Sequence, residues 1–171
     1  KAAAVFDLKR FNWVSSQQLG KLDENGFFEV IKPFMENEGV NEDYPNYKKI
    51  LLAMRTSKTN LKDIAHATRP FFFELDGYDE KGVKKFLNES LETLTFALEV
   101  LSKLTEWNET ELDMALIKVR DYFNLPIPKV NQPMRIALVG STVSPSLGLT
   151  LELFGKEKSL ERIQKAIDFI S

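Results

Sequence analysis

Cysteine is absent from this chain of 171 residues, and histidine occurs once, as His66. Without thiols the chain can form neither disulfides nor thiolate metal sites, which fits a reducing compartment, and we expect a cytoplasmic protein. The single imidazole also argues strongly against a zinc centre or a histidine-based catalytic triad. His66 is therefore expected to pack or to face solvent.

Long apolar runs are missing as well. No stretch of about eighteen residues is uniformly apolar, so we expect no transmembrane helix and no membrane partner. The first residues, Lys1 to Asp7, are too short and too soon charged for a signal peptide. The chain also begins without Met, and we expect a fragment excised from a longer protein.

Neither sign of charge is in large excess, because the net charge is −2. The strongly basic balance that is typical of nucleic-acid-binding proteins is therefore missing. A near-neutral protein can still bind RNA through a local basic face, so this argument against an RNA partner is weak.

What the sequence does have is helical periodicity along almost its whole length, without sustained period-two alternation. We therefore predict an all-α fold. A capping box, Asn108 with Glu111, opens one helix, and Pro126 and Pro128 are expected to stop it. Pro33 should kink or end an earlier one. The predicted segments are a turn or short helix over 15–19, helices over 26–37, 45–56, 60–68, 80–104, 108–124, 133–139 and 147–154, and a last helix capped by Ser159.

The aromatic segment Phe71–Tyr78 interrupts this pattern and is predicted to be irregular. We place a boundary there, between two packed helical subdomains that meet near Asp79. The longest predicted helix follows over 80–104. Its core-facing seam has leucines four and three residues apart, at Leu87, Leu91, Leu94, Leu98 and Leu101.

No catalytic constellation stands out. The segment Ala53–Thr59 faintly resembles an ATP-site lysine loop, but a helix end followed by a cap is the favoured interpretation. The loop between Gly140 and Gly148 lacks the Gly-Lys-Ser/Thr of a phosphate-binding P-loop. Without an acid–base or nucleophile cluster, a stand-alone enzyme is a poor hypothesis.

Arg135 is the only charged residue in the apolar segment Pro133–Val139. A guanidinium cannot lose its charge, so burying it requires a paired anion or a ligand. One interpretation is a surface-facing arginine or an internal salt bridge; the other is an arginine that contacts an RNA base or phosphate beside a loop. The residues alone modestly favour the first.

Basic residues also cluster along the third and fourth predicted helices. Solvated helix faces are the favoured explanation, and a basic stripe for an RNA backbone is the alternative. These residues are Lys48, Lys49, Arg55, Lys58, Lys62 and Arg69.

Several short motifs follow one another in a characteristic order. They are Phe6-Asp-Leu-Lys-Arg-Phe-Asn-Trp13, Ile31-Lys-Pro-Phe34, the aromatic run ending at Phe73 with Tyr78-Asp-Glu80, Glu106-Trp107, Gln132-Pro-Met-Arg-Ile-Ala-Leu-Val-Gly140, Ser144-Pro145, Leu153-Phe-Gly-Lys-Glu157 and Glu161-Arg-Ile163. In this order, and over nearly the whole chain, they resemble the carboxy-terminal anticodon-binding region of bacterial-type glutamate–tRNA ligases.

The resemblance implies a class I aminoacyl-tRNA synthetase whose complete form uses ATP and Mg²⁺ to attach glutamate to tRNA. This chain would be its anticodon-binding α-helical cage, without cofactor and without activity alone, because the catalytic domain precedes it. Its partner would be the glutamate tRNA, and neither DNA nor a membrane is expected. Residues 1–23 would end the stem-contact region, 24–79 would form the first helical subdomain, and 80–171 the second.

The family's functional positions fall on this chain as follows. Arg135 matches an arginine that contacts an anticodon base, and Ser144 and Leu147 match the loop that packs against the anticodon. Where enzymes restricted to the glutamate tRNA place an arginine that reads the third base, this chain has Ser57; a slip of the alignment would put Arg55 or Lys58 there. We hypothesise that the parent enzyme is non-discriminating and also charges the glutamine tRNA. The alternative function is a helical protein–protein adaptor without RNA binding.

Overall fold

The computed structural model describes residues 16–171, with side chains from Gln18 onward, and the described part is helical without strands. The predicted all-α class is therefore confirmed. The motif Phe6–Trp13 and the residue Ser15 lie outside the described residues. None of the described helices is long and apolar enough to cross a membrane. The chain divides into two compact units, the first ending at Phe73 and the second spanning Glu74–Ser171.

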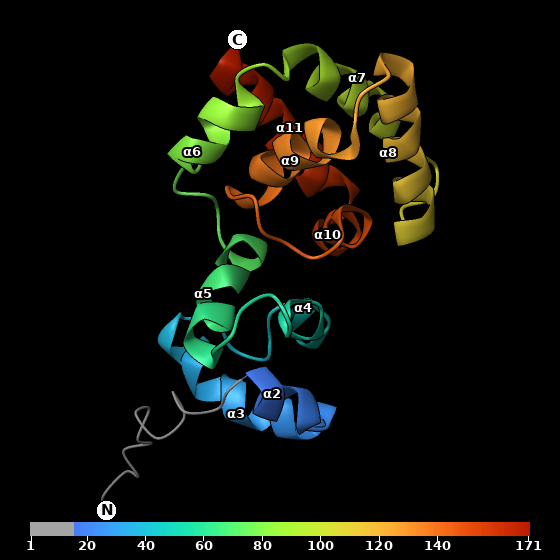
Figure 1. The fold of residues 1–171 in the computed structure, drawn as a ribbon. Helices are drawn as coiled ribbons and strands as arrows, with labels where there is room; N and C mark the ends of the chain where they lie inside the picture. Colours follow the sequence, from blue (N-terminus) through green and yellow to red (C-terminus); the bar gives the residue numbers. More distant parts are fainter. Residues whose placement is uncertain (1–15) are drawn as a thin grey trace, which may run out of the picture. The chain divides into compact units, whose positions relative to one another are not determined.

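The first unit is built around α5, which packs against both α3 and α4. Its helices are α2 (Ser16–Lys21), α3 (Glu24–Asn37), α4 (Tyr47–Met54) and α5 (Leu61–Phe72) (Figure 1). The apolar faces predicted for α3, α4 and α5 form its core, in which Phe27, Ile31, Leu51 and Ile64 are fully buried. Asp23 caps α3 by accepting a hydrogen bond of 2.7 Å from the backbone N–H of Gly26.

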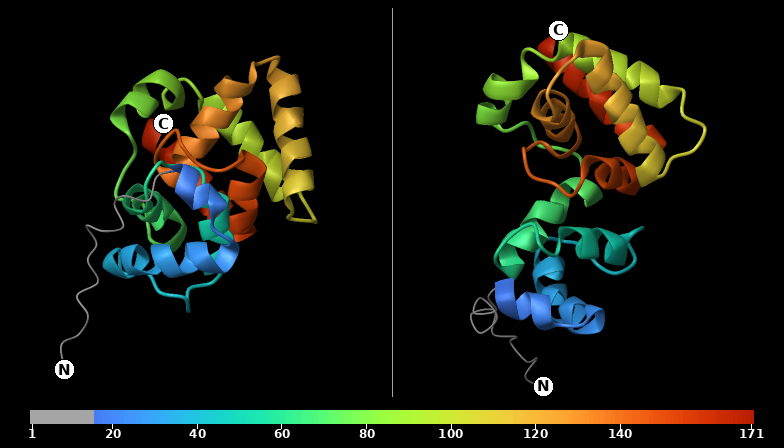
Figure 2. Two further views of the ribbon diagram at one scale, coloured as in Figure 1. Left: turned by 60° about the horizontal axis from the view of Figure 1, so that its bottom comes forward. Right: turned by 45° about the vertical axis from the view of Figure 1, so that its right-hand side comes forward.

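The second unit surrounds a central helix, α9. It contains α6 (Glu80–Gly82), a π-helical turn η1 (Val83–Leu87), α7 (Leu91–Ser102), α8 (Glu109–Phe123), α9 (Ile127–Val139), α10 (Leu147–Phe154) and α11 (Lys156–Ile170). All the other elements of the unit contact α9 (Figures 1 and 2). Its side chains Val130, Met134, Ile136 and Leu138 are fully buried.

The predicted single helix over 80–104 is wrong, because the chain breaks it at Asn88–Ser90. The N–H of Asn88 bonds to Val83 O at 3.0 Å, which closes a π-turn. The hydroxyl of Ser90 then donates to Leu87 O at 2.6 Å. In a continuous helix the N–H of Leu91 would use that carbonyl, so a short polar side chain has replaced the helical bond.

Two helices continue past an internal proline. Pro33 does not end α3, and α5 continues past Pro70 to Phe72, where the sequence indicated an irregular chain. Phe72 is held there by its edge-on contact with Tyr44, with ring centroids 5.5 Å apart. Packing therefore outweighs the hydrogen bond that each proline removes.

The starts of α9 and of the last helix, α11, differ from the predicted ones. Asn124, in the left-handed conformation, ends α8, whereas Pro126 and Pro128 open α9 at its N-cap and first turn. This is a favourable place for proline, so α9 begins at Ile127 and not at Pro133. The last helix begins at Lys156. Ser159 does not cap it but is buried, with its hydroxyl donating to Leu151 O at 3.3 Å.

Candidate RNA-binding site

Arg135 lies on α9 facing the loop that follows this helix, residues 141–146. Its Nε donates to the Ser144 hydroxyl at 2.8 Å, and its Nη2 donates to Pro145 O at 3.4 Å. The helical spacing that buries Met134 and Ile136 leaves Arg135 half-buried at the edge of the core. Two of the predicted site residues, Arg135 and Ser144, are thus brought together by the fold.

The charge of Arg135 has no counter-charge within the described residues. Neither of its hydrogen-bond partners is a carboxylate, and it belongs to no ion pair. Burial lowers the pKa of Arg135, yet a guanidinium stays protonated in a protein. The internal salt bridge considered from the sequence is therefore not formed within the described residues, and no carboxylate contacts the guanidinium directly.

Ser144 is fixed by a second hydroxyl that the sequence analysis missed. Thr150, fully buried in α10, lies with its hydroxyl 3.2 Å from that of Ser144 and donates to Ser146 O at 2.9 Å. Ser144 itself donates to Pro145 O at 2.9 Å. The four-residue spacing of Ser146 and Thr150 at a helix start was the only signal in the sequence for this arrangement.

Two carboxylates of α8 hold the same loop from its other end. The Ser146 hydroxyl donates to Glu109 at 2.7 Å, and the Gly148 N–H bonds to the Asp113 carboxylate. Burial raises the pKa of Asp113, the nearby Glu109 charge adds to the rise, and the Gly148 N–H opposes it. A Cβ at residue 148 would overlap this carboxylate and lie 3.0 Å from Glu109 O, so glycine allows the close approach of α8 and α10.

Leu147 occupies the first turn of α10, but its side chain is only 3% exposed. A buried leucine cannot present its side chain to a base without a rearrangement. Any role it has in binding would therefore consist of anchoring the end of the loop in the core.

The loop begins at Gly140, which ends α9 with a φ of +76°. Its carbonyl accepts a hydrogen bond of 2.8 Å from the Asp79 N–H. A Cβ at this position would lie 2.8 Å from Gly77 O, in addition to the strain of the left-handed backbone. The start of the loop is thus tied to the start of α6.

The other predicted site residues belong to the first unit, in the turn between α4 and α5. The Arg55 guanidinium donates to the carbonyls of Leu19 and Leu22, at 2.6 Å for the latter, and lies 5.0 Å from the Phe27 ring. It is thus engaged in holding its own unit together. The Ser57 hydroxyl donates to Met54 O at 2.6 Å. Lys58 makes no hydrogen bond or ion pair with the described residues.

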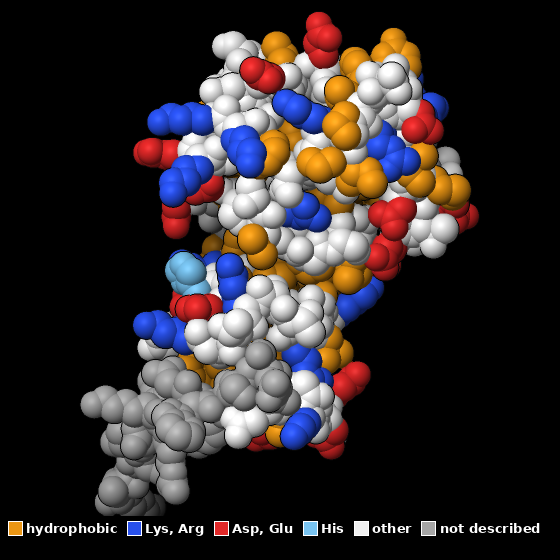
Figure 3. All heavy atoms as spheres, in the orientation of Figure 1, with side chains coloured by type: hydrophobic (Ala, Val, Ile, Leu, Met, Phe, Trp, Pro, Cys, Tyr) orange, Lys and Arg blue, Asp and Glu red, His pale blue; other side chains and the backbone are white. Residues whose placement is uncertain are grey.

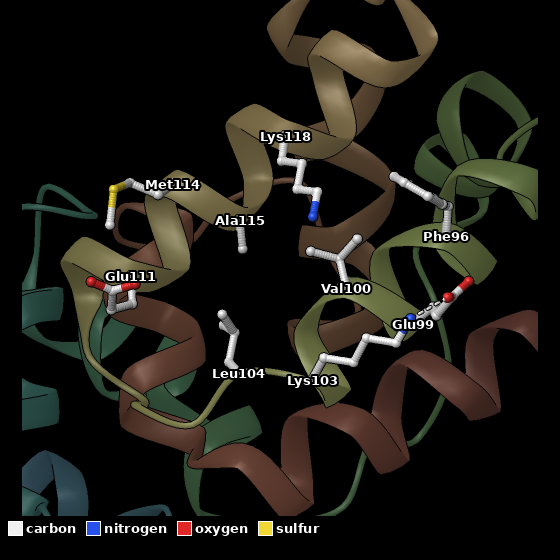
Figure 4. A pocket seen from close by; sticks show the side chains of 9 residues that line it. All are labelled: Phe96, Glu99, Val100, Lys103, Leu104, Glu111, Met114, Ala115 and Lys118. Carbon is white, nitrogen blue, oxygen red and sulfur yellow. Dashed lines mark hydrogen bonds and ion pairs between the residues drawn. The ribbon is translucent and has the colours of Figure 1, made fainter.

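A cavity of about 540 Å³ lies between α7 and α8 in the second unit. Figure 4 shows its lining of apolar side chains, such as Val100 and Met114, alongside Lys118 and the ion pair Glu99–Lys103. None of the predicted site residues lines it, and it offers no nucleophile beside a base. The residues from 18 onward also contain no group of three or more potential metal ligands.

Comparison with known proteins identifies the family. Residues 26–167 match the Anticodon binding domain family. The chain belongs to this family. Its curated relatives include glutamate–tRNA ligase 2 of Thermoanaerobacter pseudethanolicus, 32% identical over 99% of this chain, and glutamate–tRNA ligase of Thermodesulfovibrio yellowstonii, 30% identical over 98%. The chain spans 36% and 37% of these two proteins.

Solved structures agree with this family assignment. A glutamate tRNA ligase from Elizabethkingia meningosepticum has a TM-score of 0.79 and 25% identity over 94% of this chain and 32% of that one. A second, from Elizabethkingia anophelis, has a TM-score of 0.75 at 24% identity over 95% of this chain and 32% of that one, which supports the fold. The family resemblance found in the sequence motifs is therefore confirmed, and the adaptor hypothesis gains no support.

Proposed function

We propose that this chain binds the anticodon loop of a tRNA and forms the anticodon-binding part of a glutamate–tRNA ligase. The observation that carries the proposal is the half-buried Arg135 guanidinium, which has only neutral partners and lies beside the loop 141–146. A cation held in this way still has unused donors that can bind a base edge or a phosphate. Unpaired anticodon bases are accessible to such contacts.

The parent enzyme would attach glutamate to tRNA in the cytoplasm with the aid of ATP and Mg²⁺. The chain spans only 36% and 37% of two glutamate–tRNA ligases that it resembles, so we assign RNA binding to this chain and the chemistry to the rest of the enzyme. Within the second unit Arg135 and Ser144 would contact the anticodon, and Leu147 would anchor their loop. In the first unit we assign the third base to the turn of Ser57, with Lys58 as a further contact; Arg55 is the weaker candidate because its guanidinium is already engaged.

Ser57 motivates a finer proposal. A small neutral side chain whose hydroxyl already bonds to Met54 O would not enforce one base. We therefore propose that the parent enzyme accepts the glutamine tRNA as well as the glutamate tRNA.

The experiment is a low-salt titration of this chain with three transcripts: the glutamate tRNA, the glutamine tRNA and an unrelated tRNA. We expect comparable binding of the first two and weaker binding of the third. Arg135→Ala should reduce affinity for the first two by about 5- to 150-fold, equivalent to ~1–3 kcal/mol for one good base contact. Arg120→Ala, which removes the same charge from α8, is the matched control.

Circular dichroism of both variants must match that of the parent chain. If Arg135→Ala binds tRNA as tightly as the parent chain, Arg135 is not a base contact. If Arg135→Ala and Arg120→Ala lose the same amount of affinity, the loss is a general effect of charge. Preference for the glutamate tRNA alone would keep the function but refute relaxed discrimination.

A further inference from the structure

Three lysines of the second unit, Lys81, Lys84 and Lys85, lie close together on α6 and η1 and are all exposed. None of them forms an ion pair or hydrogen bond with any described residue; Lys85 only lies 5.1 Å from the Phe86 ring. Glu80 is adjacent to Lys81 and one turn before Lys84, but its carboxylate forms no ion pair with any described residue. Asp79 caps α6 through the Gly82 N–H at 2.6 Å, and Glu89 pairs with Lys129.

The other lysines of this unit are different, because nearly all have partners within the described residues. The exception is Lys118 on α8. Engaged lysines are Lys103 with Glu99, Lys129 with Glu89, Lys156 with Leu104 O, and Lys158 and Lys165 with Glu74 and Glu161. Among the lysines of this unit, three of the four without a partner in the described residues thus lie on α6 and η1, in addition to the unpaired charge of Arg135 on α9. Figure 3 shows basic side chains projecting from this edge of the unit.

The patch lies next to the candidate site. The Asp79 N–H bonds to Gly140 O at 2.8 Å, so α6 begins where the loop 141–146 begins. Gly82 packs against Ile136, the residue after Arg135: a Cβ on Gly82 would lie 3.0 Å from Ile136 Cδ1. A helix rises about 1.5 Å per residue, so Lys81 to Lys85 lie within roughly 10 Å of the hydrogen bond between Asp79 and Gly140, measured along the helix axis of α6 and η1. The π-turn that carries Lys84 and Lys85 is a rare geometry, often found at functional sites.

We propose that Lys81, Lys84 and Lys85 bind the phosphodiester backbone of the RNA whose unpaired bases face Arg135. Flexible ammonium groups suit phosphates, which position an RNA, and they carry little information about its sequence. Without internal anions to give up, these lysines can neutralise phosphates and release counterions. The inference rests on the proposed function but assigns a separate surface to it.

The test compares the double variant Lys81→Gln/Lys84→Gln with Lys103→Gln/Lys118→Gln, which removes the same charge from α7 and α8. Lys85 is kept because of its contact with the ring. Kd of the 171-residue chain for the glutamate tRNA and for an unrelated tRNA is measured across a salt series. The logarithm of the association constant falls as the logarithm of the salt concentration rises. In the first variant this negative slope should become shallower by about 1 to 2, since each lost phosphate contact removes roughly 0.7 to 0.9 from its magnitude.

Both tRNAs should lose affinity by the same factor in this variant, whereas Arg135→Ala changes their ratio. The control should keep the slope of the parent chain. An unchanged slope in Lys81→Gln/Lys84→Gln, or an equal decrease in the control, would overturn the inference and leave the proposed function standing. Failure of the unsubstituted chain to bind any tRNA at low salt would overturn both.

Discussion

At the scale of single residues, the hydrogen-bond and charge partners of an arginine determine whether its guanidinium is available to a ligand. Arg55 gives its guanidinium to two backbone carbonyls and an aromatic ring, so it holds the first unit together. Arg135 is held by a hydroxyl and one carbonyl, and its charge has no anion among the described residues. The same side chain is therefore structural at one position and available at the other.

Ser57 provides a residue-scale prediction. Ser57→Arg would place a guanidinium, which can bind a base edge with two hydrogen bonds, where the chain now has a hydroxyl bonded to Met54 O. We expect the ratio of Kd for the glutamine tRNA to Kd for the glutamate tRNA to rise by about 5- to 150-fold. Thr59→Arg, with the same charge change at an exposed position two residues on, should leave the ratio near that of the parent. Equal ratios in the two variants would contradict the role of Ser57.

At the scale of elements, the N-terminus of α10 is held by α8 and not by its own cap. Ser146 is the N-cap residue, but its side chain makes no capping bond and donates to Glu109 instead. The Gly148 N–H bonds to Asp113, so two carboxylates one turn apart on α8 fix the start of α10. Because α10 follows the loop 141–146, this junction determines where Ser144 lies.

Gly148→Ala tests the junction. The added methyl group would collide with the Asp113 carboxylate, and overpacking of this kind costs about 1–3 kcal/mol. We expect the urea midpoint of unfolding to fall accordingly and tRNA affinity to decrease even where the variant is folded. Gly20→Ala, with nothing within 4 Å of its new methyl group, is the control and should not destabilise the chain. A Gly148→Ala variant as stable as the parent would contradict the close α8–α10 contact.

At the scale of the whole molecule, surface carboxylates make stability depend on pH. Hydrogen bonds from Lys158 and Lys165 lower the pKa of Glu74, and Lys32, Lys103 and Lys165 similarly lower the pKa of Glu42, Glu99 and Glu161. A carboxyl group with a lowered pKa in the folded state stabilises that state above its unfolded value, near 4.5, and this contribution is lost as pH falls through the folded pKa. The raised pKa of Asp113 acts in the opposite direction.

We therefore expect the free energy of unfolding, measured by urea titration, to decrease as pH is lowered from about 5 toward 3. Glu74→Gln should flatten part of this decrease, because the carboxylate that links to α11 no longer titrates. Exposed ion pairs are weak and screened by salt, so the difference should shrink at high ionic strength. A variant with the pH profile of the parent at low salt would show that Glu74 contributes nothing to this dependence.

Local signals in the sequence were sufficient to predict much of the fold. Apolar residues at helical spacing determined the all-α class, and Asn108 with Glu111 located the start of α8, where the Asn108 side chain accepts from the Glu111 N–H at 3.0 Å. The ordered motifs identified the family, as the match over residues 26–167 confirms. These features depend on residues within a few positions of one another or on sequence order alone.

Only the tertiary structure decided the rest. The end of α5 lies at Phe72, past Pro70, where the Phe72 ring contacts Tyr44 from a distant part of the chain. The contact of Asp113 with Gly148 joins α8 to α10 across a long stretch of chain, and Arg135 on α9 meets Ser144 in the loop nine residues later. Helical spacing determines which face of each helix is buried, but which side chains then meet depends on how the helices pack, and periodicity within one helix carries no information about that.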